Sequence, residues 1–244
     1  MLLAIDIGNT NISFGLFKGS RLSKTWDIPV KNYPKTVSLK GNSFLKTSLK
    51  NIVICSVVPQ VTAKLSVDIA AISGIKPNII GKDIKVPIKN LYLDQKQLGI
   101  DRLVNAYAAS IIYGHPVIVV SCGTAITLDV VSKSGAYLGG LIQPGLNLAA
   151  SMLAAKTALL PGIKLKEPSG IIGQDTRSCI LNGVVLGAAG SIDSLIEKIR
   201  AKIGKKAPAI GTGGDIELIK KYSKHINKVD PNLTLKGINL IYEK

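Results

Sequence analysis

Three short stretches of this sequence combine glycines with hydroxyl or acidic side chains in a way that suits phosphate chemistry. They are DIGNTN (Asp6 to Asn11), SCGTAITLD (Ser121 to Asp129) and GTGG (Gly211 to Gly214). Glycines permit a tight turn whose backbone N–H groups point outward, and a nearby hydroxyl adds a donor, so such turns can cradle a polyphosphate. Each stretch taken alone is more typical of an ordinary hairpin or strand-to-helix turn. Their order along one chain is the more specific signal.

Acid–base chemistry in this chain must rest on carboxylates. Its only two histidines, His115 and His225, do not have the spacing of metal ligands, and we interpret them as surface or loop residues. The three cysteines are scattered and form no CxxC pair, which predicts reduced thiols in a cytoplasmic protein rather than disulfides or a zinc site. The cysteines are Cys55, Cys122 and Cys179.

Composition limits the class of protein. A chain of 244 residues with 46% apolar content can bury one large core or two ordinary ones. Asp129 and Lys156 interrupt the most apolar windows, so we expect no membrane span. The net charge of +16 leaves nucleic-acid binding open, but the lysines are dispersed and aromatic residues are few. We therefore expect no nucleic-acid partner and a general attraction for small anionic substrates.

The elements that position the three stretches form a repeat. Residues 2–7, 11–17 and 22–28 are predicted strands, and residues 51–58 are a buried strand followed by a helix over 61–73. After a helix over 102–113, a second cycle starts with strands over 115–120, 125–131 and 136–142. Helices over 146–159 and 178–203 and the strand–turn–helix around GTGG complete it. This repetition predicts an α/β fold of two similar domains, residues 1–114 and 115–244.

The ordered motifs resemble the actin/sugar-kinase/Hsp70 superfamily and, within it, the type III pantothenate kinases. Besides DIGNTN, the motifs are SVVP (Ser56 to Pro59), LGIDR (Leu98 to Arg102), GTAITLD (Gly123 to Asp129), GGLIQPG (Gly139 to Gly145), DTRSCILNG (Asp175 to Gly183) and TGG (Thr212 to Gly214). The resemblance implies two ribonuclease H-like, actin-like ATPase domains facing a central nucleotide cleft. It also implies ATP-dependent phosphorylation of pantothenate, the first step of coenzyme A biosynthesis.

The family's general base is the aspartate of LGIDR, which makes Asp101 the implied catalytic residue. From spacing alone Asp101 is better explained as the N-cap of the helix that follows, and Arg102 as a surface charge. The resemblance implies instead that Asp101 orients the hydroxyl of pantothenate and takes its proton late in phosphoryl transfer. The implied substrate-binding residues are Tyr92, Gly99, Ile100, Asp101, Arg102 and Thr176.

On the nucleotide side, the resemblance implies that the first and second turns line the ATP phosphates, with Asp6 holding Mg²⁺ through water. The implied ATP-binding residues are Asp6, Ile7, Gly8, Asn9, Thr10, Asn11, Ile12, Ser13 and Thr124. Thr176 stands where the family supplies a pantothenate contact from the neighbouring subunit, which implies a homodimer. The apolar stripe of the helix that follows fits such an interface, although an intramolecular core is the commoner explanation for such a stripe.

Two positions depart from the family pattern. Ser121 occupies the place of an aspartate that the family links to a required monovalent cation, K⁺ or NH₄⁺. A hydroxyl can ligate a cation but brings no charge, so weaker binding is expected, with Asp129 as a candidate substitute. Asp175 replaces an asparagine and adds a negative charge while keeping the ability to cap a helix.

Three alternatives to a pantothenate kinase stay open. One is a kinase for another small hydroxylated substrate, such as a sugar kinase, which a substrate panel would identify. Another is a weak or silent regulatory homologue that binds nucleotide without turnover. The last is a nucleic-acid binder driven by the positive charge, which would show salt-dependent retention on DNA.

Overall fold

The computed structural model describes residues 1–33 and 49–244, so the polar segment 34–48 lies outside the described residues. The chain divides into two compact units. Unit 1 comprises Met1–Ile88, Leu93–Ala108 and Asn232–Lys244, and unit 2 comprises Lys89–Tyr92 and Ala109–Pro231. The contiguous division expected from the sequence placed residues 115–244 together, whereas here the last 13 residues belong to unit 1. Each unit is described by itself.

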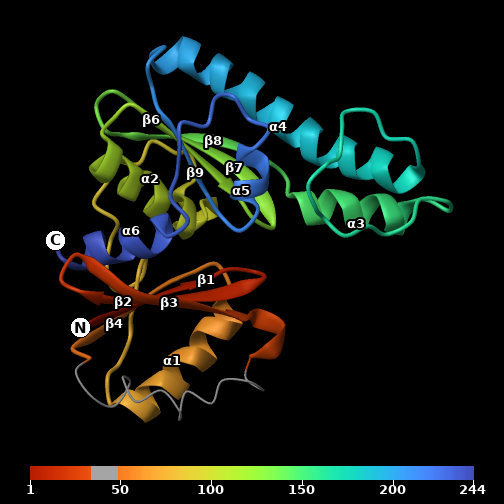
Figure 1. Ribbon diagram of the computed structural model, residues 1–244. Helices are drawn as coiled ribbons and strands as arrows, with labels where there is room; N and C mark the ends of the chain where they lie inside the picture. Colours follow the sequence, from red (N-terminus) through yellow and green to blue (C-terminus); the bar gives the residue numbers. More distant parts are fainter. Residues whose placement is uncertain (34–48) are drawn as a thin grey trace. The chain divides into compact units, whose positions relative to one another are not determined.

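Unit 1 is a five-stranded sheet with helices on both faces (Figure 1). Its strands are β1 (Leu2–Ile7), β2 (Asn11–Lys18), β3 (Arg21–Pro29), β4 (Asn51–Ser56) and β5 (Asn78–Ile79), in the order β3-β2-β1-β4-β5. The first three strands are antiparallel, and β4 and β5 run parallel to β1 and β4. Short 3₁₀ turns cover Val30–Asn32 and Gln95–Gln97.

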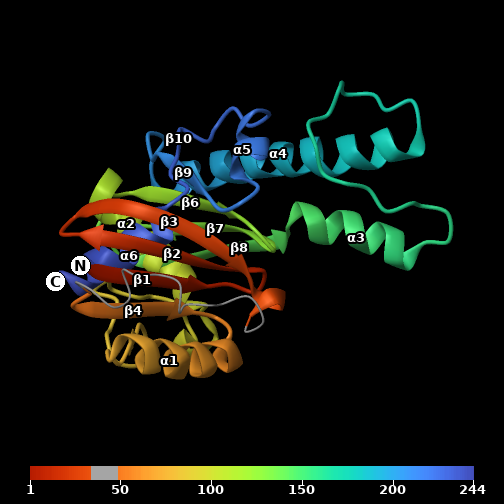
Figure 2. The ribbon, with the colours of Figure 1, turned by 60° about the horizontal axis from the view of Figure 1, so that its bottom comes forward.

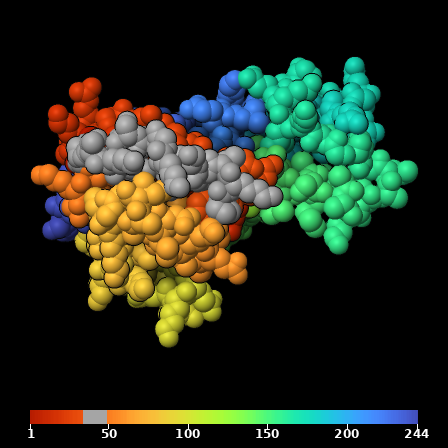
Figure 3. Space-filling view, turned by 90° about the horizontal axis from the view of Figure 1, so that it is seen from below, coloured from red at the N-terminus to blue at the C-terminus, as the bar shows by residue number. Residues whose placement is uncertain are grey.

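Three helices bury the two faces of this sheet. Helix α1 (Pro59–Ser73) packs Leu65 and Ile69 against one face, while its outer side, which includes the exposed Val67, is open to solvent (Figure 3). Helix α6 (Leu233–Tyr242) and the first half of α2 (Ile100–Tyr113) cover the other face. The absence of a side chain at Gly237 lets α6 cross α2 closely, because a Cβ there would lie 2.7 Å from Val104 Cγ1.

Unit 2 repeats the strand plan of unit 1. Its strands β6 (Val117–Cys122), β7 (Ala125–Val131), β8 (Tyr137–Pro144), β9 (Ala209–Thr212) and β10 (Lys228–Val229) are ordered β8-β7-β6-β9-β10. Again the first three are antiparallel and the last two parallel. Helices α4 (Thr176–Ile203) and α5 (Ile216–Lys220) cover one face. The predicted duplication of a strand–turn–strand unit is therefore confirmed, as is the α/β class.

Helix α3 (Leu146–Lys156), the loop 157–175 and the first half of α4 extend beyond the sheet of unit 2 (Figure 2). We call residues 146–190 the arm. By length and composition alone, the 28-residue α4 could cross a membrane. Core helices of soluble proteins pass the same test, and α4 packs Val185, Ile192 and Ile196 into the core of unit 2, so this is weak evidence for a span.

Candidate active site

The first predicted turn joins β1 and β2 in unit 1. The Gly8 N–H donates to the carbonyl of Asn11 (3.0 Å), which closes the turn and leaves Asn9 and Thr10 exposed. Ile7 and Ile12, which flank it, are fully buried in the core against α1. Of the predicted ATP-binding residues, these two isoleucines can therefore offer only backbone groups, while the turn itself offers both backbone and side-chain donors.

Four polar residues form a line across the sheet directly beside this turn. Asp6 of β1 pairs with Ser13 of β2, Ser13 pairs with Asp27 of β3, and Asp6 pairs with Cys55 of β4. Directly paired residues point to the same face of a sheet, so all four share the face that α2 and α6 cover. We call Asp27, Ser13, Asp6 and Cys55 the acid row.

The electrostatics of the acid row are dominated by repulsion and burial. Burial, followed by the negative charges of Asp101 and Asp27, raises the pKa of Asp6 to about 7. Burial and the carboxylates of Asp6 and Asp101 raise the pKa of the Cys55 thiol well above its ordinary value, so it stays protonated and unreactive. Asp6 is thus poised to bind either a proton or a cation near neutral pH.

Asp101 reaches the acid row from the first turn of α2. The helix begins at Ile100, so Asp101 lies inside its first turn and is not the N-cap that its spacing suggested. Gly99 makes room for the carboxyl, because a Cβ at Gly99 would lie 2.6 Å from Asp101 Oδ1. Arg102 is only 7% exposed, so its interpretation as a surface charge is wrong. Ile100 packs its side chain against Gly81 and the core of unit 1.

The second predicted turn, in unit 2, is held from two sides by glycines. Gly123 donates to the carbonyl of Ala125 (3.0 Å) and closes the turn, which leaves Thr124 exposed. A Cβ at Gly145, the N-cap of α3, would lie 2.1 Å from the Gly123 carbonyl oxygen. A Cβ at Gly213, whose φ is +95°, would lie 2.4 Å from the Cys122 carbonyl oxygen. The GGLIQPG and GTGG motifs therefore brace this turn.

The row of unit 2 that corresponds to the acid row carries hydroxyls. Ser121 of β6 pairs with Thr127 of β7 and with Thr212 of β9, on the face away from α4 and α5. We call these three residues the hydroxyl row. Asp129, the candidate substitute for the missing acid, is 1% exposed and accepts hydrogen bonds from Thr127 Oγ1 (2.9 Å) and Tyr137 OH (2.7 Å). It is a buried structural carboxylate.

The remaining predicted substrate residues lie elsewhere in unit 2. Tyr92 packs beside Tyr137, with ring centroids 6.3 Å apart, and a Cβ at Gly139 would lie 3.5 Å from the Tyr92 ring. Thr176 is exposed at the start of α4, in the arm. Asp175 caps that helix through a reciprocal capping box with Ser178, and these hydrogen bonds lower the pKa of Asp175. The capping role expected of Asp175 is confirmed.

The structure thus brings Asp6, Ser13 and Asp101 together in unit 1, and Ser121 and Thr124 together in unit 2. Sequence reasoning missed Asp27, because its pairing with Ser13 depends on the register of β2 and β3, which no local pattern gives. It also missed Asp215, at the start of α5, whose carboxylate accepts a hydrogen bond from Asn147 and whose pKa burial raises.

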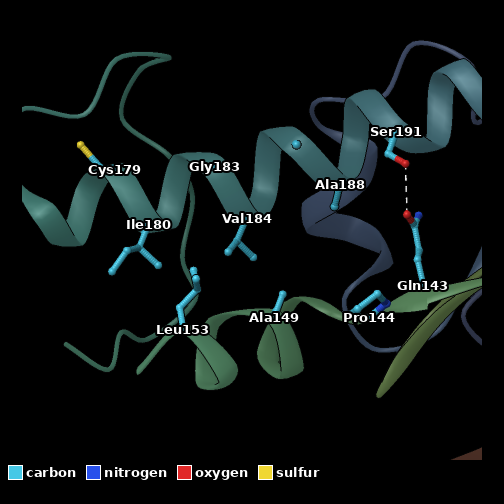
Figure 4. A pocket seen from close by; sticks show the side chains of 11 residues that line it. Gln143, Pro144, Ala149, Leu153, Cys179, Ile180, Gly183, Val184, Ala188 and Ser191 are labelled. Atoms are coloured by element: carbon cyan, nitrogen blue, oxygen red, sulfur yellow. Dashed lines mark hydrogen bonds between the residues drawn. The ribbon is translucent and has the colours of Figure 1, made fainter. Parts of the chain in front are cut away.

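A cavity of about 400 Å³ in unit 2 contains none of the predicted site residues. It lies between α3 and α4, where Val184 and Ala188 face Ala149 and Leu153 (Figure 4). At one end, Ser191 Oγ donates to Gln143 Oε1 (3.0 Å). Its lining is mostly apolar and small, which is unlike the charged site that phosphoryl transfer needs.

Comparison with known proteins places this geometry in a family. The family model described as Type III pantothenate kinase matches residues 2–198. The type III pantothenate kinase of Moorella thermoacetica is 37% identical over 100% of this chain and 99% of its own length. The type III pantothenate kinase of Finegoldia magna is 39% identical over 99% of this chain and 96% of its own length.

Among solved structures, a Campylobacter jejuni protein described as a Baf family transcriptional activator has a TM-score of 0.61 and 22% identity, covering 99% of this chain and 97% of its own. A glucokinase of the ROK family from Streptomyces griseus has a TM-score of 0.53 and 12% identity, covering 100% and 99%. At these identities the likeness concerns the fold alone. It confirms the predicted two-domain fold of actin-like ATPases and sugar kinases.

Proposed function

The chain belongs to the type III pantothenate kinase family, and we propose that it phosphorylates pantothenate with ATP through the carboxylate of Asp101. The observation that carries the role of Asp101 is its place over Gly99, in the first turn of α2 and beside Asp6. The product is 4′-phosphopantothenate, in the pathway to coenzyme A.

In the proposed reaction, Asp101 accepts a hydrogen bond from the primary hydroxyl of pantothenate and takes its proton late. A bond forms between that oxygen and the γ-phosphorus, while the bond from the γ-phosphorus to the bridging oxygen breaks and ADP leaves. The transition state is loose, so Asp101 acts mainly by positioning the nucleophile. Arg102 is proposed to pair with the substrate carboxylate or a phosphate through its planar guanidinium. Tyr92 and Thr176 are proposed as further pantothenate contacts.

The two turns are each proposed as phosphate contacts. The turn at residues 8–10 and the turn at Gly123 and Thr124 both expose backbone and hydroxyl donors, which suit phosphate oxygens. Asp6 fits a divalent cation, because its desolvated carboxylate meets two further negative charges in unit 1. Mg²⁺ bound there through water would neutralise part of the charge on the phosphates.

A monovalent cation fits the second turn less well. The hydroxyl row offers three neutral oxygens, and Asp129, two residues from Thr127 on the same face of β7, is already engaged by Thr127 and Tyr137. The row therefore supplies no free negative charge for K⁺ or NH₄⁺. We propose that this chain depends on such a cation less than a chain with an acid at position 121.

We propose that the protein is a cytoplasmic homodimer assembled through the arm. The arm exposes six large apolar side chains, which a second copy of the chain would cover. They are Leu148, Met152, Leu153, Leu159, Ile171 and Ile172. Thr176 begins α4 on the same arm, which suits a contact made to the partner's pantothenate. The three free thiols agree with a cytoplasmic location.

The kinase assay combines purified protein, ATP, Mg²⁺ and pantothenate, with a panel of sugars and other small alcohols as alternative acceptors. We expect 4′-phosphopantothenate from wild type, and a loss of at least about 100-fold in kcat for Asp101→Asn with ATP binding retained. If the folded wild-type protein binds ATP but forms no product, the proposed activity is refuted and a regulatory role is favoured. If it forms a sugar phosphate instead of 4′-phosphopantothenate, a sugar-kinase function is favoured.

Mixing two inactive variants tests the shared site. Asp101→Asn and Thr176→Val each damage a different part of the site. If the Thr176 contact crosses subunits, a mixed dimer has one site with both native residues, Asp101 from one subunit and Thr176 from the other. Its second site carries both substitutions. Random exchange should then restore about a quarter of wild-type activity. Mixtures no more active than the variants alone would place the Thr176 contact within its own subunit.

A further inference from the structure

The acid row of unit 1 contains one carboxylate that the proposed reaction does not use. Asp27 lies on β3, exposed, two strands away from Asp6 and separated from it by Ser13. Neighbouring strands are about 4.8 Å apart, so the Cα atoms of the two aspartates are about 10 Å apart, with both side chains on one face. The negative charge of Asp27 is the third contribution to the raised pKa of Asp6, which also indicates that they are close.

The duplicated fold shows that β-sheet formation does not require these acids. The two sheets have the same strand order and the same pairing directions, so the rows of the two units correspond position by position. In unit 2 the position equivalent to Asp6 is Ser121, and the position equivalent to Asp27 is Ile142, which is 64% exposed. The same strand plan forms in unit 2 with serine and isoleucine at these positions. The two aspartates of unit 1 are therefore not required for folding, and we look for their role in ligand binding.

The described part of this chain places no hydrogen-bond donor or positive charge against the carboxylates of the two aspartates. Among the residues that the structure describes, neither Asp6 nor Asp27 receives a hydrogen bond or forms an ion pair, although the chain as a whole carries a net charge of +16. A partly buried carboxylate without a donor is costly, and a second one on the same face adds repulsion. A bound cation would remove both costs.

A hydrated divalent cation matches the spacing of the row. Mg²⁺ binds one or two carboxylates and keeps several of its waters, whose hydrogens then donate to further acceptors around the ion. The hydroxyl of Ser13, between the two aspartates, can accept from such a water or donate to a carboxylate. Replacing a residue that holds a metal's ligands through hydrogen bonds typically weakens metal affinity by about 10- to 100-fold.

We propose that Asp27 is a second metal-positioning carboxylate, which holds the waters of the divalent cation that Asp6 binds. This inference rests on the proposed kinase function in one respect, which is that a kinase uses Mg²⁺ and the cation is therefore taken to be Mg²⁺. Asp27 touches neither reacting atom, so it raises the affinity for the metal and leaves the chemical step to Asp101.

Mn²⁺ binding tests this proposal without turnover. Free Mn²⁺ is measured by electron paramagnetic resonance while Mn²⁺ is added to the protein, first alone and then with a non-hydrolysable ATP analogue. We expect Asp27→Asn to weaken Mn²⁺ binding about tenfold and Asp27→Glu to recover part of the loss. Glu243→Gln, which removes one acid from the C-terminal end of α6, serves as the matched control and should change the affinity less than twofold.

Kinetics give a second readout. Asp27→Asn should raise the Mg²⁺ concentration needed for half-maximal rate by a similar factor, with kcat unchanged at saturating Mg²⁺. Unchanged Mn²⁺ affinity in Asp27→Asn, or equal weakening in Glu243→Gln, would overturn the proposal. A protein that shows the Mn²⁺ effect but does not phosphorylate pantothenate would refute the proposed function and leave the role of Asp27 standing.

Discussion

Replacing Asp6 by asparagine is expected to stabilise the metal-free protein, and increasingly so as the pH rises. In the folded chain the pKa of Asp6 is raised from 3.8 to about 7, so the unfolded chain loses this proton first. Between these two values each pH unit lowers the stability of the wild type by about 1.4 kcal/mol, and above pH 7 the full cost is present. Asparagine cannot ionise and escapes this cost.

The shift of about three pKa units sets the upper limit of the effect at about 4 kcal/mol. Asp6 is partly open to solvent, which screens its charge, so we expect a gain of about 2 kcal/mol or more at pH 8.5 and a smaller gain at pH 5. Urea unfolding of both proteins in EDTA at the two pH values measures the difference. The same stability difference at both would refute the argument, and Glu243→Gln controls for the loss of one acid.

Three further predictions follow from close contacts and departures at the site. Gly99→Ala should displace the Asp101 carboxyl, because its Cβ would meet Oδ1 at 2.6 Å, and should lower kcat by about tenfold or more with ATP binding retained. Gly145→Ala should push the Gly123 carbonyl away, raise the KM for ATP and cost about 1–3 kcal/mol in thermal unfolding; an unchanged KM would remove this turn from the nucleotide site. Ser121→Asp should make the rate more sensitive to K⁺ than wild type in a titration against Na⁺, and an unaltered response would place any cation site elsewhere.

The repeated strand plan was predictable because its signals are local. Alternating and continuous apolar runs marked most strands, and the glycine turns at Gly8 and Gly123 marked the two hairpins. The chain's return to unit 1 was not predictable in this way. The predicted division assigns residues 233–242 to the second domain, and only the packing of Leu235 and Ile238 against the first sheet places helix α6 in unit 1.

Local patterns in the sequence marked the two candidate turns, but they could not show which residues are buried or which residues pair across strands. Asp101 and Arg102 came from a resemblance, because their spacing alone favoured a helix cap and a surface charge. The burial of Arg102 and of Asp129 depends on tertiary packing that no local pattern reports. Asp27 could not be identified for a related reason, because its position on the same face as Asp6 depends on the register of three strands.

The duplicated sheets argue for a division of roles between two sheets that share their strand order and pairing directions. At corresponding positions unit 1 carries Asp6 and Asp27, and unit 2 carries Ser121 and Ile142. Carboxylates repel a phosphate unless a cation stands between them, whereas hydroxyls and backbone N–H groups bind phosphate oxygens directly. We therefore expect the turn of unit 1 to need a metal for phosphate binding and the turn of unit 2 to bind phosphate without one. We expect Asp6→Ser to abolish most activity. Adding Ser121→Asp to this variant moves the acid to the other unit and should not restore the activity, because Asp101 would then lie in the unit without the metal.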